Sequence, residues 1–169
     1  MKNILVARID DRLIHGQVMT AWVKSYPINH ILIVDDELAK NQFMLNIYKA
    51  AMPAGIKVSI TSKAGGVELL KQDPLPGENY LILAKVPEVF AYLLDNGIPL
   101  TKLVVGGIGA KPGRKALIRN VSASDEERAC LKAMEEKGVH TVYQMVPADK
   151  EIPGLNDSKK LSEKRRKVI

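Results

Sequence analysis

The sequence predicts an α/β protein with an open, doubly wound, mainly parallel β-sheet and helices on both faces. Short, nearly continuous apolar runs recur along the chain, such as HILIV at residues 30–34, and strands buried on both faces have this composition. Stretches with apolar residues at helical spacing separate these runs, which indicates βα units. The 169 residues suffice for one domain with a substantial core.

Three strands and three helices alternate in the first half of the chain. Apolar runs predict the strands 3–7, 30–34 and 56–60. Apolar residues at helical spacing predict the helices 16–25, 38–51 and 64–71. Pro27 ends the first of these helices. The second helix is indicated by Leu38, Met44 and Tyr48, and Pro53 ends it.

The second half of the chain continues the alternation. We predict the strands 80–83, 103–105 and 140–146 and the helices 87–96 and 124–137. Pro87 occupies a first-turn position, and Gly97 closes that helix. Ser124 and Glu127 form a capping box at the start of the last helix, and Gly138 closes it. A glycine-rich loop at 106–113 and a short edge strand at 116–121 lie between the strand 103–105 and the helix 124–137. The sequence contains no internal repeat and no interdomain linker.

Composition excludes several classes of protein. The 46% hydrophobic and 26% charged residues are ordinary for a globular protein, and no apolar run is long enough to span a bilayer. The N-terminus does not read as a secretory signal, because a short apolar strand leads directly to charged residues. Cys130 is the only cysteine, which excludes an internal disulfide and a cysteine-based metal cluster and fits a reduced, cytoplasmic compartment.

The net charge of +6 is unevenly distributed. Residues 156–169 contain six Lys or Arg and two acidic residues, so this basic tail contributes +4 and the domain at 1–155 contributes +2. A solvated or frayed end is the simplest interpretation of the tail. Contact with an acidic partner, an anionic lipid surface or nucleic acid is the alternative. Nucleic-acid binding has little support, because no aromatic residues interleave with the charges and no nucleic-acid motif is present.

Three loops at the carboxyl edge of the predicted sheet contain polar residues: 8–15, 35–37 and 106–114. Ligands of open parallel sheets bind at this edge. The first loop begins the run ARIDDRLIHGQV, which follows the first strand and leads into the first helix. Its ionisable residues are Arg8, Asp10, Asp11, Arg12 and His15.

The position of His15 directly before a helix indicates an anion or phosphoryl site. A helix start offers unpaired backbone N–H groups and partial positive charge. Gly16 would let an anion approach the backbone, and Arg12 could bind the same anion. Asp10 could hydrogen-bond one imidazole nitrogen and leave the other as a nucleophile. The alternative is that His15 only caps the helix while Arg8, Asp10, Asp11 and Arg12 form a surface salt-bridge cluster.

Other motifs give weaker indications. The glycines from Gly107 to Gly113 match neither a dinucleotide fingerprint nor a P-loop, and they are interpreted as a turn or as a pocket rim beside the 8–15 loop. Asp35 and Asp36 either cap the next helix or add negative charge to the site edge. Trp22 is interpreted as a core or helix-face residue, with contact to a partner as the alternative. The histidines lack ligand-like spacing, so we expect neither a metal nor a cofactor.

The run from Arg8 to Val18, followed by Trp22, resembles the IIB component of the mannose/fructose/sorbose family of the bacterial sugar phosphotransferase system. The resemblance extends along nearly the whole chain. It includes Asp35-Asp-Glu37, Val104-Val-Gly-Gly107, Asn120-Val-Ser122 and the ending from Gly138 to Val146.

The resemblance implies a phosphohistidine–sugar phosphotransferase that works in the cytoplasm. The family's IIB protein accepts a phosphoryl group from phospho-IIA on Nδ1 of the histidine that aligns with His15. It then passes the group to a sugar held by the membrane IIC/IID components. These components also hold the IIB protein at the inner face of the membrane. We expect IIA to be a separate polypeptide and leave a homodimer open. The alternatives are a phosphorylation-state regulator and a basic-tailed nucleic-acid binder.

The same resemblance assigns roles to individual residues. Asp10 and Arg12 would assist His15 in catalysis. The phosphoryl group would be bound by Arg12, Gly16, Gln17 and Arg8. The rim of the site would contain Asp36, Gly106 and Gly107.

Overall fold

The central sheet has seven strands: β1 (Ile4–Asp10), β2 (His30–Val34), β3 (Lys57–Thr61), β4 (Tyr80–Ala84), β5 (Lys102–Gly107), β8 (His140–Tyr143) and β9 (Ile152–Pro153). Their order is β3-β2-β4-β1-β5-β8-β9, and all neighbours pair in parallel except β9, which is antiparallel to β8. The computed structural model describes residues 1–154, so the basic tail at 156–169 lies outside the described residues.

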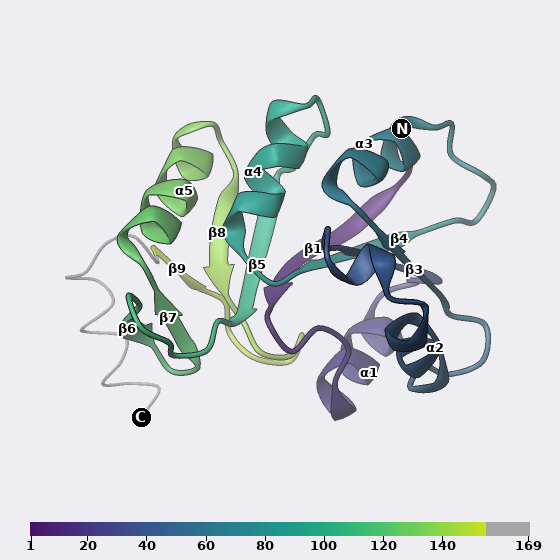
Figure 1. Ribbon diagram of the computed structural model, residues 1–169, viewed down its shortest axis with the longest axis horizontal. Helices are drawn as coiled ribbons and strands as arrows, with labels where there is room; N and C mark the ends of the chain where they lie inside the picture. Colours follow the sequence, from purple (N-terminus) through teal and green to yellow (C-terminus); the bar gives the residue numbers. More distant parts are fainter. Residues whose placement is uncertain (155–169) are drawn as a thin grey trace.

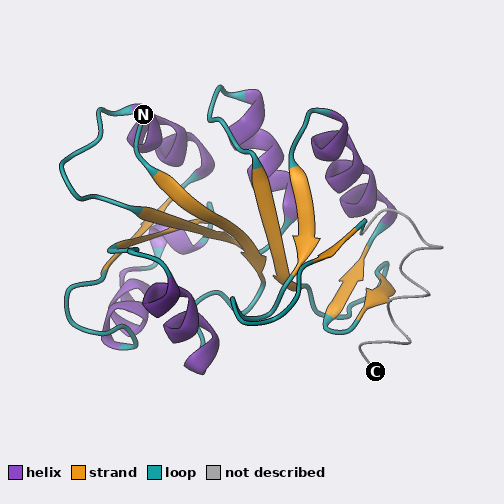
Figure 2. Cartoon of the chain, turned by 180° about the vertical axis from the view of Figure 1, so that it is seen from behind, coloured by secondary structure: helices purple, strands orange, loops and turns teal. Residues whose placement is uncertain are grey.

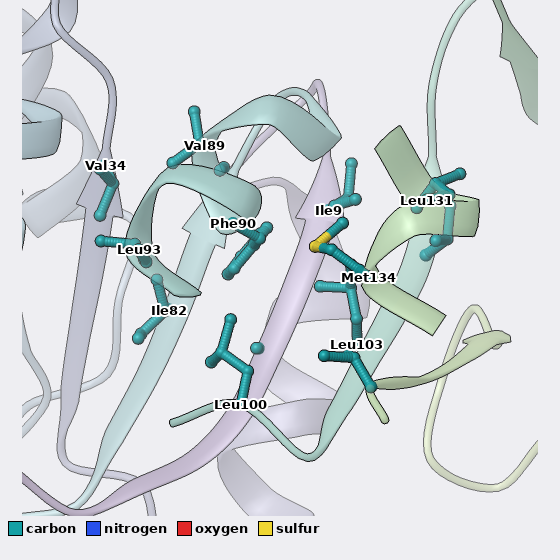
Figure 3. Close-up of a cluster of buried hydrophobic side chains, with 14 of the residues drawn as sticks. Ile9, Val34, Ile82, Val89, Phe90, Leu93, Leu100, Leu103, Leu131 and Met134 are labelled. Atoms are coloured by element: carbon teal, nitrogen blue, oxygen red, sulfur yellow. The ribbon is translucent and has the colours of Figure 1, made fainter. Parts of the chain in front are cut away.

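Helices cover both faces of the sheet (Figures 1 and 2). One face carries α1 (Gly16–Ser25) and α2 (Gln42–Ala50), and the other carries α3 (Lys63–Lys71), α4 (Pro87–Asp95) and α5 (Asp125–Glu136). Each face has its own hydrophobic core, and Figure 3 shows Phe90 and Leu93 of α4 packed over strand residues such as Ile9 and Ile82. Burying the apolar face of each helix on the sheet is the main source of stability for such an architecture. The predicted fold class is confirmed.

The first strand is longer than the sequence predicts. β1 continues to Asp10, because Arg8 pairs with Leu83 of β4 and with Val104 of β5, and Asp10 pairs with Gly107. The charged side chains made these positions look like a loop. β5 likewise includes Gly106 and Gly107, which we assigned to the glycine-rich loop. The predicted loop at 8–15 is therefore short, and its first charged residues belong to the sheet.

Three further predictions need correction. The helix at 38–51 is divided into a 3₁₀ turn, η1 (Leu38–Lys40), and α2, because the Asn41 side chain accepts the Met44 N–H and starts a new helix. The edge strand at 116–121 is a hairpin of β6 (Lys115–Ile118) and β7 (Val121–Ala123), which turns at Asn120 with a φ of 64°. The last predicted strand ends at Tyr143, and β9 was not predicted.

The remaining helices agree with the prediction to within one or two residues. The capping box at α5 is confirmed: Ser124 Oγ accepts the Glu127 N–H at 3.1 Å, and Glu127 Oε1 accepts the Ser124 N–H at 3.0 Å. Within residues 1–154, none of the helices combines the length and the apolar character that crossing a membrane requires.

Candidate functional site

Two charged residues of β1 are buried at the carboxyl edge of the sheet. Successive strand residues face opposite sides, so Val6, Arg8 and Asp10 share the face that α1 covers. The Arg8 guanidinium carbon lies 5.1 Å from the centre of the Trp22 ring on α1. Arg8 and Asp10 are both 0% exposed. A surface salt-bridge cluster is therefore the wrong interpretation for these two residues.

Asp10 is the centre of the site. Its Oδ1 accepts hydrogen bonds from Arg12 N and Arg12 Nε, both at 3.1 Å. Its Oδ2 lies 3.2 Å from Arg8 Nη2, 3.3 Å from Arg12 Nη2 and 3.0 Å from His15 Nε2. Burial by itself would raise the pKa of Asp10, but the hydrogen bonds from Arg12 and His15 and the charge of Arg8 outweigh it and lower the pKa. Asp10 is thus held as a carboxylate.

Arg8 holds Asp10 from the buried side of the site. Arg8 Nη1 donates to the Gln144 carbonyl at 2.7 Å, in addition to the bond from Nη2 to Asp10. Burial lowers the pKa of Arg8, and the neighbouring Asp10 opposes that shift. Gly106 leaves the space that the guanidinium fills, since a Cβ there would lie 1.9 Å from Arg8 Nη2. Arg8 has no exposed surface, so it reaches neither the rim of the site nor a phosphate at the surface. The predicted phosphate contact of Arg8 is therefore wrong, and Arg8 positions Asp10 instead.

His15 projects from the position just before α1. Its backbone is extended (φ −146°, ψ 135°), and its side chain makes no capping hydrogen bond, so the capping interpretation is wrong. Its Nε2 is 3.0 Å from Asp10 Oδ2. A carboxylate can only accept, so Nε2 carries the proton and Nδ1 of the neutral ring keeps its lone pair. The side chain is 21% exposed, and none of the described side chains hydrogen-bonds to Nδ1.

The turn between Asp10 and α1 has unusual backbone geometry. Leu13 has a φ of 56°, and its N–H donates to the Asp10 carbonyl at 2.9 Å. Its side chain is 0% exposed, so core packing compensates for a conformation that costs about 1–3 kcal/mol. Gly16 has a φ of 43°, while a Cβ there would contact nothing within 4 Å. The left-handed backbone by itself favours glycine at this position. The side chain of Gln17 lies outside the described residues.

Arg12 is the accessible cation beside His15. Its side chain is 47% exposed although its Nε and Nη2 are bonded to Asp10. A Cβ on Gly107 would lie 3.3 Å from Arg12 Nη2, so the small residue leaves room for the guanidinium. A groove of about 430 Å³ runs from Arg12 and Asp11 along the segment from Gly107 to Ser122. The structure therefore brings His15, Arg12, Asp10 and Gly107 together, as the sequence predicted.

Asp11 and Asp36 have different roles from those expected. Asp11 Oδ2 accepts the Gly109 N–H at 2.6 Å and forms no ion pair with an arginine of the described chain. Asp36 Oδ1 accepts the Lys63 N–H at 2.8 Å at the start of α3, and β4 lies between β2 and β1. Asp36 is thus not brought to His15. Asp35 Oδ1 accepts the Leu38 N–H, which confirms the capping interpretation for that residue.

Sequence reasoning missed the contribution of the segment after β8. The Gln144 carbonyl accepts from Arg8, and the Met145 carbonyl accepts the indole N–H of Trp22 at 2.9 Å. The Met145 sulfur lies 3.7 Å from Arg12 Nη2. Trp22 is 1% exposed, which confirms its place in the core. The sequence does predict a strand at 140–146. Local pattern does not show, however, that this strand lies beside β5, so its contribution to the site could not be predicted.

No group of three or more His, Cys, Asp or Glu side chains within residues 1–154 is arranged to hold a metal ion. The fold and the site together define an α/β protein with an oriented, accessible imidazole and a neighbouring arginine at the carboxyl edge of its sheet.

Comparison with known proteins identifies the family. Residues 4–167 match the model of the PTS system sorbose subfamily IIB component. The sorbose-specific EIIB component of Lacticaseibacillus casei is 33% identical over 146 residues, which cover 86% of this chain and 89% of that protein. The crystal structure of manxB from Thermoanaerobacter tengcongensis matches with a TM-score of 0.85 and 38% identity over 97% of each chain.

A second solved structure agrees. The IIBSor domain of the sorbose permease from Klebsiella pneumoniae has a TM-score of 0.85 and 29% identity, covering 95% of this chain and 97% of that domain. The chain therefore belongs to the sorbose subfamily of IIB components of the sugar phosphotransferase system. These matches confirm the resemblance on which the prediction rested, and IIB components are phosphotransferases in general.

Proposed function

We propose that His15 carries the phosphoryl group. Its Nδ1 accepts the group from the phosphohistidine of a IIA protein and passes it to a sugar held by membrane IIC/IID components. The protein then works in the cytoplasm at the inner face of the membrane. The observation that supports this proposal most strongly is the 3.0 Å contact between Asp10 Oδ2 and His15 Nε2, because it leaves Nδ1 as the nucleophilic nitrogen.

The first transfer needs positioning more than covalent assistance. The Nδ1 lone pair forms a bond to phosphorus while the phosphorus–nitrogen bond of the donor imidazole breaks. The Nε2 proton stays hydrogen-bonded to Asp10, whose charge stabilises the phosphorylated ring. In the second transfer a sugar oxygen bonds to phosphorus, the bond to Nδ1 breaks, and the hydroxyl proton passes to a base of the acceptor protein.

The surrounding groups have separate roles in this proposal. Arg12 binds the phosphoryl oxygens from the exposed side, since its guanidinium is anchored to Asp10 and 47% exposed. Backbone N–H groups at Gly16 and Gln17 contribute the positive end of α1. Gly107 leaves room for Arg12, and Arg8 holds Asp10. A partly exposed site suits a carrier, which must release the group as readily as it binds it.

Phosphorylation of the purified protein tests the proposal. The protein is incubated with phosphoenolpyruvate, the general carrier proteins and a IIA donor, and the modified residue is mapped by mass spectrometry. We expect one acid-labile phosphoryl group per chain on His15 and none in His15→Ala. His140→Ala is the matched control, because His140 is exposed on β8. Label that persists in His15→Ala would refute the assignment.

Transfer onward distinguishes a carrier from a regulator. Phosphorylated protein is added to membranes that contain IIC and IID and is offered candidate sugars. A carrier loses its label to a sugar, whereas a protein whose phosphorylation serves only as a signal keeps it. Retention of the label with every sugar of the mannose, fructose, sorbose and amino-sugar classes would contradict the carrier role.

A further inference from the structure

A basic segment borders the proposed phosphoryl site; it consists of the loop after β5 and the hairpin of β6 and β7, and we call it the basic hairpin. The segment from Gly107 to Ala123 contains four cationic residues and no Asp or Glu. One of them, Arg114, is neutralised by Glu127, with Nε–Oε1 and Nη2–Oε2 distances of 2.8 and 2.9 Å. The other three are exposed and form no ion pair with any residue of the described chain. We call these three the hairpin cations: Lys111, Lys115 and Arg119.

The hairpin is tied to the loop that carries His15. The Gly109 N–H donates to Asp11 Oδ2 at 2.6 Å, and the Gly109 carbonyl accepts from Arg114 Nη1 at 2.9 Å. Arg12 and residues of the hairpin line one groove. Figure 1 shows β6 and β7 at the lower edge of the molecule, which is also where the loop from β1 to α1 lies. The backbone that carries the hairpin cations is therefore attached to the loop that carries His15.

The composition of the hairpin favours a lipid surface over a protein partner. Specific protein interfaces are built around buried aromatic or apolar anchors and are depleted in lysine. The apolar side chains Leu117 and Ile118 are buried, so they offer no such anchor. The exposed residues besides the cations are small or polar, such as Pro112 and Ala116. A surface of anionic headgroups attracts each nearby Lys or Arg by about 1 kcal/mol without any apolar anchor.

We propose that the hairpin cations bind anionic phospholipid headgroups and so turn the phosphoryl edge toward the membrane. The biological reason for this binding rests on the proposed function, because transfer to an acceptor in the membrane requires His15 to face the bilayer. Each cation close to an anionic surface raises partition onto it about fivefold, so three cations account for roughly a hundredfold. Binding of this strength is reversible, which a carrier that shuttles between donor and acceptor needs.

Vesicle sedimentation tests the inference on the full chain. The vesicles are phosphatidylcholine alone or phosphatidylcholine with about one third phosphatidylserine. The test variant is Lys111→Gln/Lys115→Gln/Arg119→Gln. The control variant is Lys49→Gln/Lys57→Gln/Lys132→Gln, which removes the same charge from exposed positions on α2, β3 and α5. Both variants keep the basic tail.

We expect the wild type and the control to bind the phosphatidylserine vesicles alike, and the test variant to bind them roughly a hundredfold more weakly. Binding should weaken with salt for all three proteins. Equal losses in the two variants, or equal binding of the wild type to both vesicles, would overturn the inference. So would slower phosphorylation of the test variant by the donor without vesicles, which would assign the hairpin cations to the donor protein. Vesicle binding is measured without a phosphoryl donor, so a failure to phosphorylate His15 would refute the proposed function separately.

Discussion

The guanidinium of Arg8 occupies the space in which residue 106 would carry a side chain. A Cβ built on Gly106 lies 1.9 Å from Arg8 Nη2 and 2.2 Å from Arg8 Cζ. Arg8 cannot move aside, because it is 0% exposed and bonded to Asp10 and to the Gln144 carbonyl. A glycine in β5 thus permits a buried arginine in β1, which in turn orients the carboxylate that holds His15.

Substitution of Gly106 tests this packing. Gly106→Ala is expected to lower the free energy of unfolding by about 3 kcal/mol, near the upper end of the cost of overpacking. Gly107→Ala is the matched control in the same strand, because its nearest neighbour is the exposed Arg12 at 3.3 Å, and we expect a loss below about 1 kcal/mol. Urea denaturation measures both values. Equal stability of the two variants would show that Arg8 does not need the space.

Asp10 is expected to set the tautomer of His15. In the wild type, ¹⁵N spectra of the neutral imidazole should show a protonated Nε2 and an unprotonated Nδ1. The amide of Asp10→Asn can present either its oxygen or its NH2 group to the imidazole, so the preference for a protonated Nε2 should disappear. Phosphoryl transfer should then slow by at least about tenfold. Asp11→Asn is the control and should keep the tautomer, since Asp11 bonds Gly109 instead. An unchanged tautomer in Asp10→Asn would contradict the proposed role.

Arg12 should matter more for transfer than for folding. Arg12→Ala removes one or two hydrogen bonds to the phosphoryl oxygens, worth about 1.5–3 kcal/mol each, so transfer should slow roughly 10- to 100-fold or more. The free energy of unfolding should fall by about 1–3 kcal/mol, because Arg12→Ala also removes the Nε and Nη2 hydrogen bonds to the buried Asp10. Arg12→Lys should recover part of the rate, because it keeps the charge but not the planar donors. Unchanged transfer kinetics in Arg12→Ala would remove this residue from the mechanism.

The ion pair between Arg114 and Glu127 should stabilise the fold more than an exposed pair of the same length. Its side chains are only 6% and 7% exposed, and Glu127→Gln leaves the arginine charge unpaired, at a cost of about 3–5 kcal/mol. The exposed pair of Lys137 and Asp95 is also 2.8 Å long, and Asp95→Asn should cost less than about 1 kcal/mol. Thermal or urea unfolding compares the two variants. Similar losses would mean that burial does not determine the strength of the pair.

Glu78, which lies near the amino ends of β4 and β1, should contribute to the loss of stability at acid pH. Lys2 Nζ, 2.8 Å from Glu78 Oε2, is the main reason why the pKa of Glu78 falls from 4.5 to about 2, and the Tyr80 hydroxyl also donates to this carboxylate. Because the folded-state pKa is the lower one, the stabilisation is present above pH 4.5 and is lost as the pH falls toward 2.

Unfolding free energies measured across this pH range test the contribution of Glu78. Glu78→Gln should depend less steeply on pH than the wild type in this window. Glu68→Gln, at an exposed position of α3, should follow the wild type. Identical slopes for the wild type and Glu78→Gln would contradict the prediction.

Much of the candidate site could be predicted from the sequence. His15 follows a strand and precedes a helix within one continuous segment, so local pattern placed it at the carboxyl edge. Arg12 and Asp10 are its neighbours in the same segment and were assigned correctly to its surroundings. Asp36 was placed wrongly, because sequence pattern does not reveal that β4 separates β2 from β1.

The sequence by itself determined the alternation of strands and helices, the fold class and the residue that could carry a phosphoryl group. The alternation and the fold class depend on hydrophobic periodicity and helix caps, which act over a few residues, whereas the choice of His15 rests on the resemblance of the run from Arg8 to Val18 to the IIB family. Only the tertiary structure decided that Arg8 and Asp10 are buried, that Gln144 and Met145 complete the site, and that Asp11 holds the loop at Gly109. Those contacts join segments about a hundred residues or more apart, and the order of strands in the sheet brings them together.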